Sequence, residues 1–490
     1  MKLSHLSRLV VVLALTAGPA AAQTPEASLL DALSLISGGL LVPKDPPPEV
    51  THDGDLYHVR VPLPALTAPP NAAIEASARP VANGAWYITG LTLPPTGSWT
   101  IQGTIQGKDS SPPGVMTYAI GRQAFRATVD PSLSVPSPFK AELGHIILRT
   151  EATGQHADQT IERYGLEGTL SGDADRHLNV RARGSLANWS VTNRGDQPGT
   201  GFKASIRSVA LRYDVDGLDR ARAERLRAAA RAFSAERRGA MAAAPGGRMP
   251  DMTPAARAQL GAMIDALGGL MNRVKLDETI QGVHFEASNG SAVDAGRIRL
   301  GMVGDARNGR LTAYCDIDVS DPAASMVPME YASYMPRRIV IRPTLSGVRT
   351  GALLQWLRDA AADGGNLVAL QARAAALLDE PGSRAGIENL LVEAGPLRLD
   401  GWARLRPRPD GPPGFDVHLA ATGLDAMIGT LQQDPRAMQV LPMVFIAKGM
   451  AKPQGDSLVW DIAFNGGAVM VNGIPLGQAQ PGLRPPASRR

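Results

Sequence analysis

The sequence has one cysteine, Cys315, and few aromatic residues, which make up 4% of its 490 positions. A single cysteine excludes an intramolecular disulfide, so the chain must rely on packed cores, and its length leaves room for two or more domains. Sugar-stacking platforms and nucleotide sites commonly use aromatic faces, so the scarcity of aromatics argues against both. Cys315 alternates with Leu311, Ala313 and Ile317. This pattern predicts a buried structural thiol, because a reactive thiolate needs an accessible, electropositive setting.

A strong charge of either sign and a long apolar run are also missing. The formal net charge is +4, and removing Lys2 and Arg8 with a predicted N-terminal leader lowers it by two, to +2. A nearly neutral chain does not suggest a nucleic-acid partner, since nucleic acids attract basic surfaces. After the leader, no stretch approaches the roughly 20 apolar residues that cross a bilayer as a helix.

The segment 1–22 is typical of a secretory signal peptide. Lys2 and Arg8 give a positive start, Leu9–Leu15 an apolar core, and Ala20–Ala22 a small-residue cleavage site. The residue after the cleavage site is Gln23 and not a cysteine, which argues against a lipoprotein anchor. We therefore expect a protein that is exported to the periplasm and has no transmembrane span.

The motifs of common active sites are absent. The sequence has no H-E-x-x-H, no G-x-S-x-G nucleophile elbow, no Walker A loop and no G-x-G-x-x-G after a strand. The histidines beyond the leader are scattered, and we interpret them as surface residues: His52, His58, His145, His156, His177, His284 and His418. The sequence therefore supplies no candidate catalytic residue, cofactor-binding residue, cofactor or metal ligand.

Two acidic groups were weighed as metal sites. Asp214, Asp216 and Asp219 in DVDGLD resemble a calcium loop, but the remaining ligands of an EF-hand, including its terminal glutamate, are missing. Asp219 is better explained as a helix cap, because an acidic residue at a helix start accepts hydrogen bonds from free amides. The group between Asp316 and Asp321 lies mostly on the polar face of a strand, which predicts solvated carboxylates.

The N-terminal half alternates short strands with turns. Segments such as MTYAIG, QAFRATVD and HIILRTEAT read as strands, and Ala82-Asn83-Gly84 reads as a turn. Many short strands joined in this way indicate a large antiparallel meander with one dry face. We therefore predict a β-rich domain over residues 23–215.

The C-terminal half favours an α+β repeat region over residues 216–478. Strands lead into helices at Gly217, Gly347 and Gly423. The returning strands are glycine-bounded, at Gly296–Gly301, Gly395–Gly401 and Gly467–Gly473. Recurrence in fixed order predicts three strand–helix–helix–strand units whose helices pack on one sheet face, at about 216–330, 331–407 and 408–478. Chance similarity of short motifs is the alternative.

The repeat has consequences for single residues. In each returning strand the apolar side chains should face the helices, as at Ile298, Leu300, Leu397, Leu399, Val469 and Val471, because strand side chains alternate. The residues that should then face away are Arg297, Arg299, Arg398, Met470 and Asn472. The tail, residues 479–490, is rich in proline and arginine and is predicted to be disordered.

The succession FDVHLAATGLDAMIGTL, VLPMVFIAKGMAKPQGDSLVWDIAF and GGAVMVNGIPLG resembles the end of an alphaproteobacterial family of periplasmic proteins. That family carries only the label of a domain of unknown function. The resemblance covers roughly Gly414–Leu476, and upstream it is architectural. It implies a periplasmic location and brings no catalytic residues.

The segment Asp219–Arg238 is rich in arginine and carries a thin apolar stripe. A basic amphipathic helix can lie against anionic lipid, here through Arg220, Arg222, Arg227 and Arg231. The stripe contains only two large residues, Leu226 and Phe233, which favours a solvated helix covering the sheet.

Two functions remain open from the sequence. One is a non-enzymatic envelope protein that binds a lipid-like ligand or a protein partner in an apolar groove, because the apolar content is mostly Ala, Leu and Val. The other is an envelope hydrolase whose site is assembled from residues distant in sequence.

Overall fold

The computed structural model describes residues 24–37, 47–63, 69–101, 114–130, 135–152, 155–172, 177–195, 199–243, 252–327, 334–362, 376–408, 414–435, 439–465 and 468–478. The predicted signal peptide and the predicted C-terminal tail lie outside these residues. The chain divides into two compact units, residues 1–292 and 293–490, and each unit is described by itself.

Unit 1 is mostly strand. It contains α2 (Pro25–Ser37), β1 (Glu49–Asp53), β2 (Leu56–Pro62), β3 (Ala73–Pro80), the 3₁₀ turn η1 (Ala82–Gly84), β4 (Trp86–Thr92), β5 (Thr96–Ile101), β6 (Gly114–Asp130), β7 (Val135–Ala152), β8 (Gln155–Gly172), β9 (His177–Gly195), β10 (Gly201–Asp219), α3 (Arg220–Ala243), α4 (Pro254–Leu267) and β11 (Arg273–Ala287).

Unit 2 begins within its first strand. It contains β12 (Ala292–Asp305), the 3₁₀ turn η3 (Arg307–Gly309), β13 (Arg310–Ala324), β14 (Arg338–Arg349), α5 (Thr350–Ala362), β15 (Arg384–Ala394), β16 (Leu397–Arg406), β17 (Gly414–Thr422), α7 (Leu424–Gln432), α8 (Leu441–Met450), β18 (Lys452–Gln454), β19 (Ser457–Asn465), β20 (Ala468–Val471) and β21 (Ile474–Gln478).

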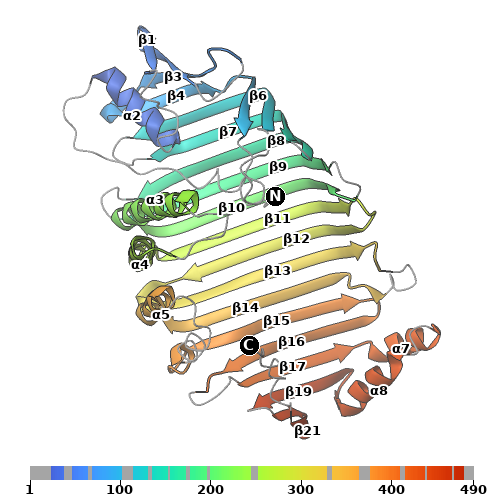
Figure 1. Cartoon of the computed structure of the whole chain (residues 1–490). Coiled ribbons are helices and arrows are strands. Elements are labelled where there is room, and N and C mark those ends of the chain that lie inside the picture. Colours follow the sequence, from blue (N-terminus) through green and yellow to red (C-terminus); the bar gives the residue numbers. More distant parts are fainter. Residues whose placement is uncertain are drawn as a thin grey trace. The chain divides into compact units, whose positions relative to one another are not determined.

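The strands of unit 1 follow one another as an antiparallel meander. From β6 to β11 each strand pairs with the next one in sequence, as Figure 1 shows. These strands are long: β6 has 17 residues and β9 and β10 have 19 each, whereas most strands have 3–10. The order of these strands in the sheet is therefore their order in the chain.

Helix α2 closes the first core of unit 1. Leu29 and Leu33 are buried against Val59 on β2 and Ile74 on β3. At the helix, the Trp86 indole Nε1 donates a 3.1 Å hydrogen bond to the Ser28 hydroxyl. This is the one place in the described part of unit 1 where a helix covers a sheet face with a continuous apolar contact.

A second core lies between strands alone. In it, Leu143 and Ile146 of β7 belong to the same apolar cluster, although residues three apart in a regular strand face opposite sides. Leu186 and Trp189 of β9 repeat this arrangement. The side-chain alternation therefore shifts by one residue in the middle of the long strands.

The shift follows a line of residues that lie opposite one another. Ile120 pairs with Ile146 and Arg122 with Gly144, which places Gly121 opposite His145. His145 has a backbone φ of 53°, and Asn188 and Gly282, further along the line, have 49° and 61°. A positive φ reverses the local strand geometry, which keeps the apolar face continuous. The alternation of apolar and polar residues in the sequence is consequently interrupted at Gly121. MTYAIG and QAFRATVD were predicted as two strands, but they form one strand, β6.

Unit 2 is also an antiparallel meander. Strands β12 to β17 pair in sequence order, β17 pairs with β19, and β19 pairs with β20. Its core contains Ala421, Trp460 and Val471, with Leu397 and Leu399 packed against them. The Trp460 Nε1 donates a 2.7 Å hydrogen bond to the Ala447 carbonyl, which ties α8 to the sheet.

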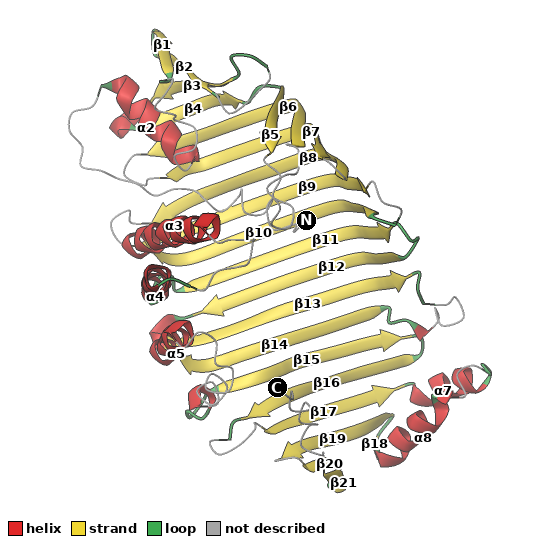
Figure 2. Ribbon diagram, viewed as in Figure 1, coloured by secondary structure: helices red, strands yellow, loops and turns green. Residues whose placement is uncertain are grey.

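The predicted α+β fold of strand–helix–helix–strand repeats is wrong. The described residues form mainly long antiparallel strands, and the helices sit in hairpin connections: α3 and α4 lie between β10 and β11, yet these strands pair directly. Figure 2 shows α3 and α4 at the ends of those strands, where α3 packs mainly on α4. Strands β14 and β15 likewise pair directly across α5. A hairpin connection can carry helices without interrupting the strand ladder, so helices that recur along the chain need not form a layer.

This pairing also explains the unit boundary. The sequence placed a domain boundary at residue 216, whereas the compact units meet after residue 292. Strand β11, which follows the helices, pairs with β10 from Asp216↔Arg273 to Phe202↔Ala287 and so belongs to unit 1.

The recurring glycines mark a shared corner. Gly217, Gly347 and Gly423 have φ values of 66°, 73° and 72°, where a strand turns into a helix. A Cβ on Gly347 would lie 2.1 Å from the Gly382 carbonyl oxygen, and one on Gly423 would lie 1.9 Å from that of Pro396. Only glycine fits a left-handed corner with another backbone this close.

The returning strands show the predicted alternation. Arg297, Arg299, Arg398 and Met470 are exposed, whereas Val471 is buried and its neighbours on the same face are half-buried. All three strands, β12, β16 and β20, lie within the one sheet of unit 2. The alternation of side chains along a single strand could therefore be predicted from the sequence, although the predicted repeat is wrong.

Candidate functional site

The four arginines proposed for membrane contact do not share an exposed face. Arg220 is largely buried, with 16% of its side chain exposed, and its Nε lies 3.3 Å from a Glu224 oxygen. Arg222 pairs with Asp219. The Arg227 Nη1 is buried without a hydrogen-bond partner in the structure, and burial lowers the pKa of this guanidinium. Arg231 is exposed.

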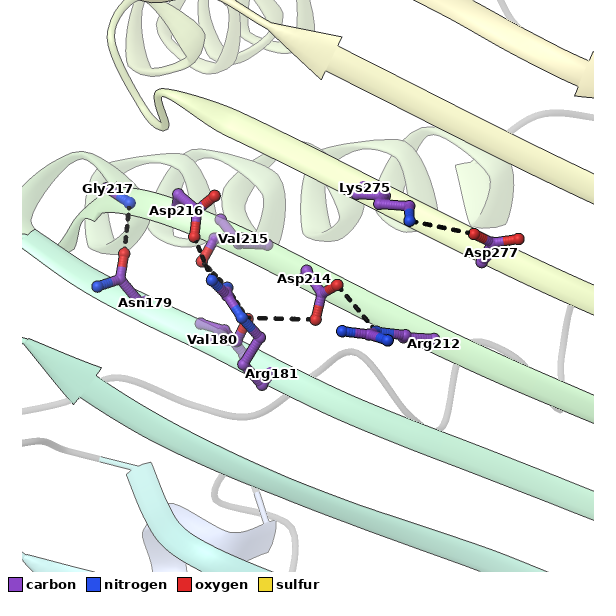
Figure 3. Close-up of polar contacts among 10 residues, drawn as sticks. All are labelled: Asn179, Val180, Arg181, Arg212, Asp214, Val215, Asp216, Gly217, Lys275 and Asp277. Carbon is purple, nitrogen blue, oxygen red and sulfur yellow. Dashed lines mark hydrogen bonds and ion pairs between the residues drawn. The ribbon is translucent and has the colours of Figure 1, made fainter.

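The DVDGLD segment is an ion-pair and capping site. The Asp219 carboxylate accepts a 2.9 Å hydrogen bond from the Arg222 amide, as the capping prediction requires. The Arg181 guanidinium of β9 contacts Asp214 at 3.5 Å and also Asp216, and Figure 3 shows it lying between the two carboxylates. Arg212 holds the other side of Asp214 at 3.0 Å. Arginine therefore occupies the space that a metal ion would need.

The predicted solvated carboxylates of β13 are Asp316, Asp318 and Asp321; Asp321 is exposed, but the prediction is wrong for Asp318. Asp318 is only 9% exposed, and both its oxygens accept hydrogen bonds from Arg338, at 3.1 and 2.9 Å. The Arg338 guanidinium holds the pKa of Asp318 below its usual range. Asp316 pairs in the same way with Arg342. The sequence pattern missed this because the arginines come from the neighbouring strand.

Histidines and thiols do not assemble into a metal centre within the described ranges, where no group of three potential ligands occurs. Cys315 is a free, half-buried thiol. His418 lies 2.8 Å from Asp461 through Nδ1 and stacks on Trp402, with ring centroids 5.6 Å apart. The Arg404 guanidinium covers the same indole at 4.4 Å, so this aromatic surface is already occupied.

The longest apolar surface is one face of the unit 1 sheet, which we call the apolar face. Rows of apolar side chains cross the strands β6–β11 in register. One row reads Ile120, Ile146, Ile161, Trp189, Ile206 and Val283. The next row reads Leu143, Tyr164, Leu186, Val209 and Ile280.

Among the described residues, the core beneath the first of these rows is formed by strands alone. Phe285, next to that row on β11, is 42% exposed and stacks on Phe202 with ring centroids 5.6 Å apart. The described helices α3 and α4 pack mainly on each other at one end of the strands. In the first row, Ile161 on β8 and Trp189 on β9 are only 2% and 8% exposed, so the face is buried there. Over β10 and β11, Ile206 and Val283 are half-buried and lie beside the exposed Phe285.

Polar side chains interrupt the apolar face, among them the buried Gln159 together with Glu278, Tyr164 and Tyr213. Glu278 lies opposite Leu211, and burial raises the pKa of its carboxyl. Burial also raises the pKa of the Tyr164 and Tyr213 hydroxyls. A carboxyl and phenols in such rows can hydrogen-bond a ligand's polar atom while the surrounding side chains contact its apolar part.

No family model, curated protein or solved structure matches the chain. The resemblance of Gly414–Leu476 to a periplasmic family therefore stays a prediction. Within the described ranges, none of the helices is both long enough and apolar enough to cross a membrane.

Proposed function

We propose that this protein is an exported, non-enzymatic binding protein that takes a lipid-like amphiphile on the apolar face of unit 1. The observation that carries the proposal is the end of the in-register apolar rows on β10 and β11, where the side chains are half-buried and lie beside the exposed Phe285. A contiguous apolar surface of this kind on a soluble protein is commonly a binding surface.

Two features favour an amphiphile over a protein partner. The rows are mainly aliphatic, and protein interfaces are instead enriched in aromatic residues and arginine. Glu278 and the two tyrosines add isolated polar groups within the apolar rows, which suits a ligand with one polar end. The hydrolase alternative gains no support from the described residues, where no group of three His, Cys, Asp or Glu side chains could hold a metal ion.

A fluorescent label that senses polarity tests the proposal. In a Cys315→Ala background, Ile280→Cys places the label on the apolar face and Thr279→Cys places it on the opposite face, because adjacent strand residues alternate. Titration with lysophosphatidylcholine below its micellar concentration should shift the emission of the label at 280 to the blue, with saturation. The label at 279 should respond little.

Equal shifts at both positions would contradict the proposal, since they would indicate general adsorption. No shift at position 280, in a variant with an unchanged melting temperature, would mean that another part of the chain or a second copy occupies the face. Either result would remove the lipid-like ligand as the function.

A further inference from the structure

A cavity lies on the polar face of the unit 1 sheet, opposite the apolar face. Its volume is about 690 Å³, within the range of small-molecule sites. Side chains of β6 to β10 line it, together with Tyr87 of β4. All the lining residues belong to unit 1, so the site does not depend on unit 2.

The lining is unusually basic. Five cationic side chains contribute to it: Arg126, Lys140, Arg181, Arg183 and Arg212. Of the carboxylates, Glu167 and Asp214 are the ones that reach the same lining. Arg181 and Arg212 share Asp214, Arg181 also contacts Asp216, and Lys140 pairs with Glu142 at 2.8 Å. The weakly compensated charge of the cavity therefore belongs to Arg126 and Arg183.

Four of the five basic side chains, all except Arg181, stand in one row across the sheet. Arg126 pairs with Lys140, and Arg183 with Arg212, as direct cross-strand neighbours. The complete row reads Arg126, Lys140, Glu167, Arg183, Arg212 and Asp277. Like charges directly opposite one another destabilise a sheet. Fold stability therefore does not explain the two like-charge pairs, Arg126–Lys140 and Arg183–Arg212.

Two members of this row have weak or no compensation. Arg183 lies 4.0 Å from Glu167, and both side chains are largely exposed. Arg126 is exposed and forms no ion pair or hydrogen bond in the described part of the chain. Both residues line the cavity, so Arg126 without a partner and Arg183 with one weak ion pair are available to a ligand there.

A second cavity, of about 520 Å³, lies along the other side of the row and shares Lys140, Arg183 and Arg212 with the first. Small residues make room there, because Gly165, Ser185 and Ala210 occupy successive strands in the next row. The basic row therefore lies between the two cavities, and its side chains can contact a ligand in either one.

We propose that this row binds a multiply charged anion, a phosphate or sulfate ester group, through Arg126, Arg183 and their neighbours. Guanidinium groups bind phosphate and sulfate oxygens with paired, charge-assisted hydrogen bonds. A bound dianion would also remove the repulsion within the like-charge pairs. The ligand is separate from the amphiphile on the apolar face, because the sheet lies between the two sites.

The double variant Arg126→Gln/Arg183→Gln tests the site. Calorimetric titration with inorganic pyrophosphate should show binding to the parent protein, weakened by at least about tenfold in the variant. Pyrophosphate should also raise the melting temperature of the parent and not that of the variant, because a ligand that binds only the folded state stabilises it. Without ligand, the variant should melt at the parent's temperature or above.

The matched control is Arg122→Gln/Arg163→Gln, which removes two exposed charges from the same face outside both cavities. Arg122 has a 4.0 Å ion pair with Glu142, and Arg163 has no ion pair in the described ranges. The control therefore matches the test variant, in which Arg183 has one weak ion pair and Arg126 has none. This control should bind pyrophosphate within about twofold of the parent.

Three results would overturn the proposal. They are no binding of pyrophosphate by the parent, an equal loss in the control, or a lower melting temperature of the ligand-free test variant, which would make the arginines structural. A flotation arm separates the sources of the group: vesicles containing phosphatidic acid, compared with pure phosphatidylcholine, should bind the parent and not the test variant if the phosphate is a lipid headgroup. Pyrophosphate binding without vesicle binding would support the site with a free phosphorylated ligand.

Discussion

Gly423→Ala is expected to destabilise unit 2 by about 2–4 kcal/mol in the free energy of unfolding. The residue has a φ of 72°, and its missing Cβ would lie 1.9 Å from the Pro396 carbonyl oxygen. An alanine would be strained in the left-handed backbone conformation, and its Cβ would also force two backbone segments apart. Chemical denaturation followed by circular dichroism measures the change.

The other corner glycines give a graded series. Gly347→Ala should cost about as much, because its Cβ would also meet a backbone oxygen, at 2.1 Å. Gly217→Ala should cost less, since the obstacle is the Asn272 side chain, which can rotate away. Gly429→Ala is the control: it lies inside α7 with open space around it, and alanine there should stabilise by up to about 1 kcal/mol. Equal effects at Gly423 and Gly429 would show that the corner is not tight.

Arg338→Leu is expected to lower the stability of unit 2 by about 1.5–3 kcal/mol, because it leaves the Asp318 carboxylate without its main donors. Asp318→Leu alone should cost less than this, and the double variant less than the sum of the two, since neither then leaves a buried carboxylate unpaired. Arg299→Gln, on the exposed side of β12, serves as the control and should change stability by about 0.5 kcal/mol or less. An additive double-mutant cycle would contradict a coupled pair.

The same ion pair predicts a pH dependence. Hydrogen bonds from Arg338 lower the pKa of Asp318 in the folded protein below the value near 3.9 of an unfolded aspartate. The pair therefore contributes its full stability above about pH 4 and loses it as the pH falls through the folded-state pKa. Denaturation curves from pH 7 down to pH 2 should show a smaller acid-induced loss in Asp318→Leu than in the parent. An identical loss would mean that other carboxylates control the acid response.

Local chemistry in the sequence was sufficient for several features. Threonine followed by proline is typical of a helix start, and at Thr253-Pro254 the Thr253 hydroxyl accepts a 3.0 Å hydrogen bond from the Ala256 amide at the start of α4. Asp219 predicted a cap on α3 in the same way. Both interactions join residues three apart, so neither depends on the rest of the fold. The left-handed corners at Gly217, Gly347 and Gly423 were also visible as recurring glycines, although their meaning was not.

The length of the long strands could not be predicted from the sequence, because these strands are irregular in the middle. His145 and Asn188 take positive φ in mid-strand, and the alternation on which a sequence-based prediction relies changes phase there. Nothing in the residue types around His145 signals the change, because the shift is stabilised by its neighbours across the sheet, Gly121 among them.

Composition and periodicity alone determined that the chain is rich in antiparallel strands, how side chains alternate along the short returning strands, and where strands turn into helices. Tertiary structure alone decided that the helices lie at the strand ends, that Arg338 reaches Asp318, and that Arg183 stands opposite Arg212. The physical reason is that alternation and capping are properties of a few consecutive residues. Register instead sets which residues of different strands meet, and it is fixed by the pairing of the whole sheet.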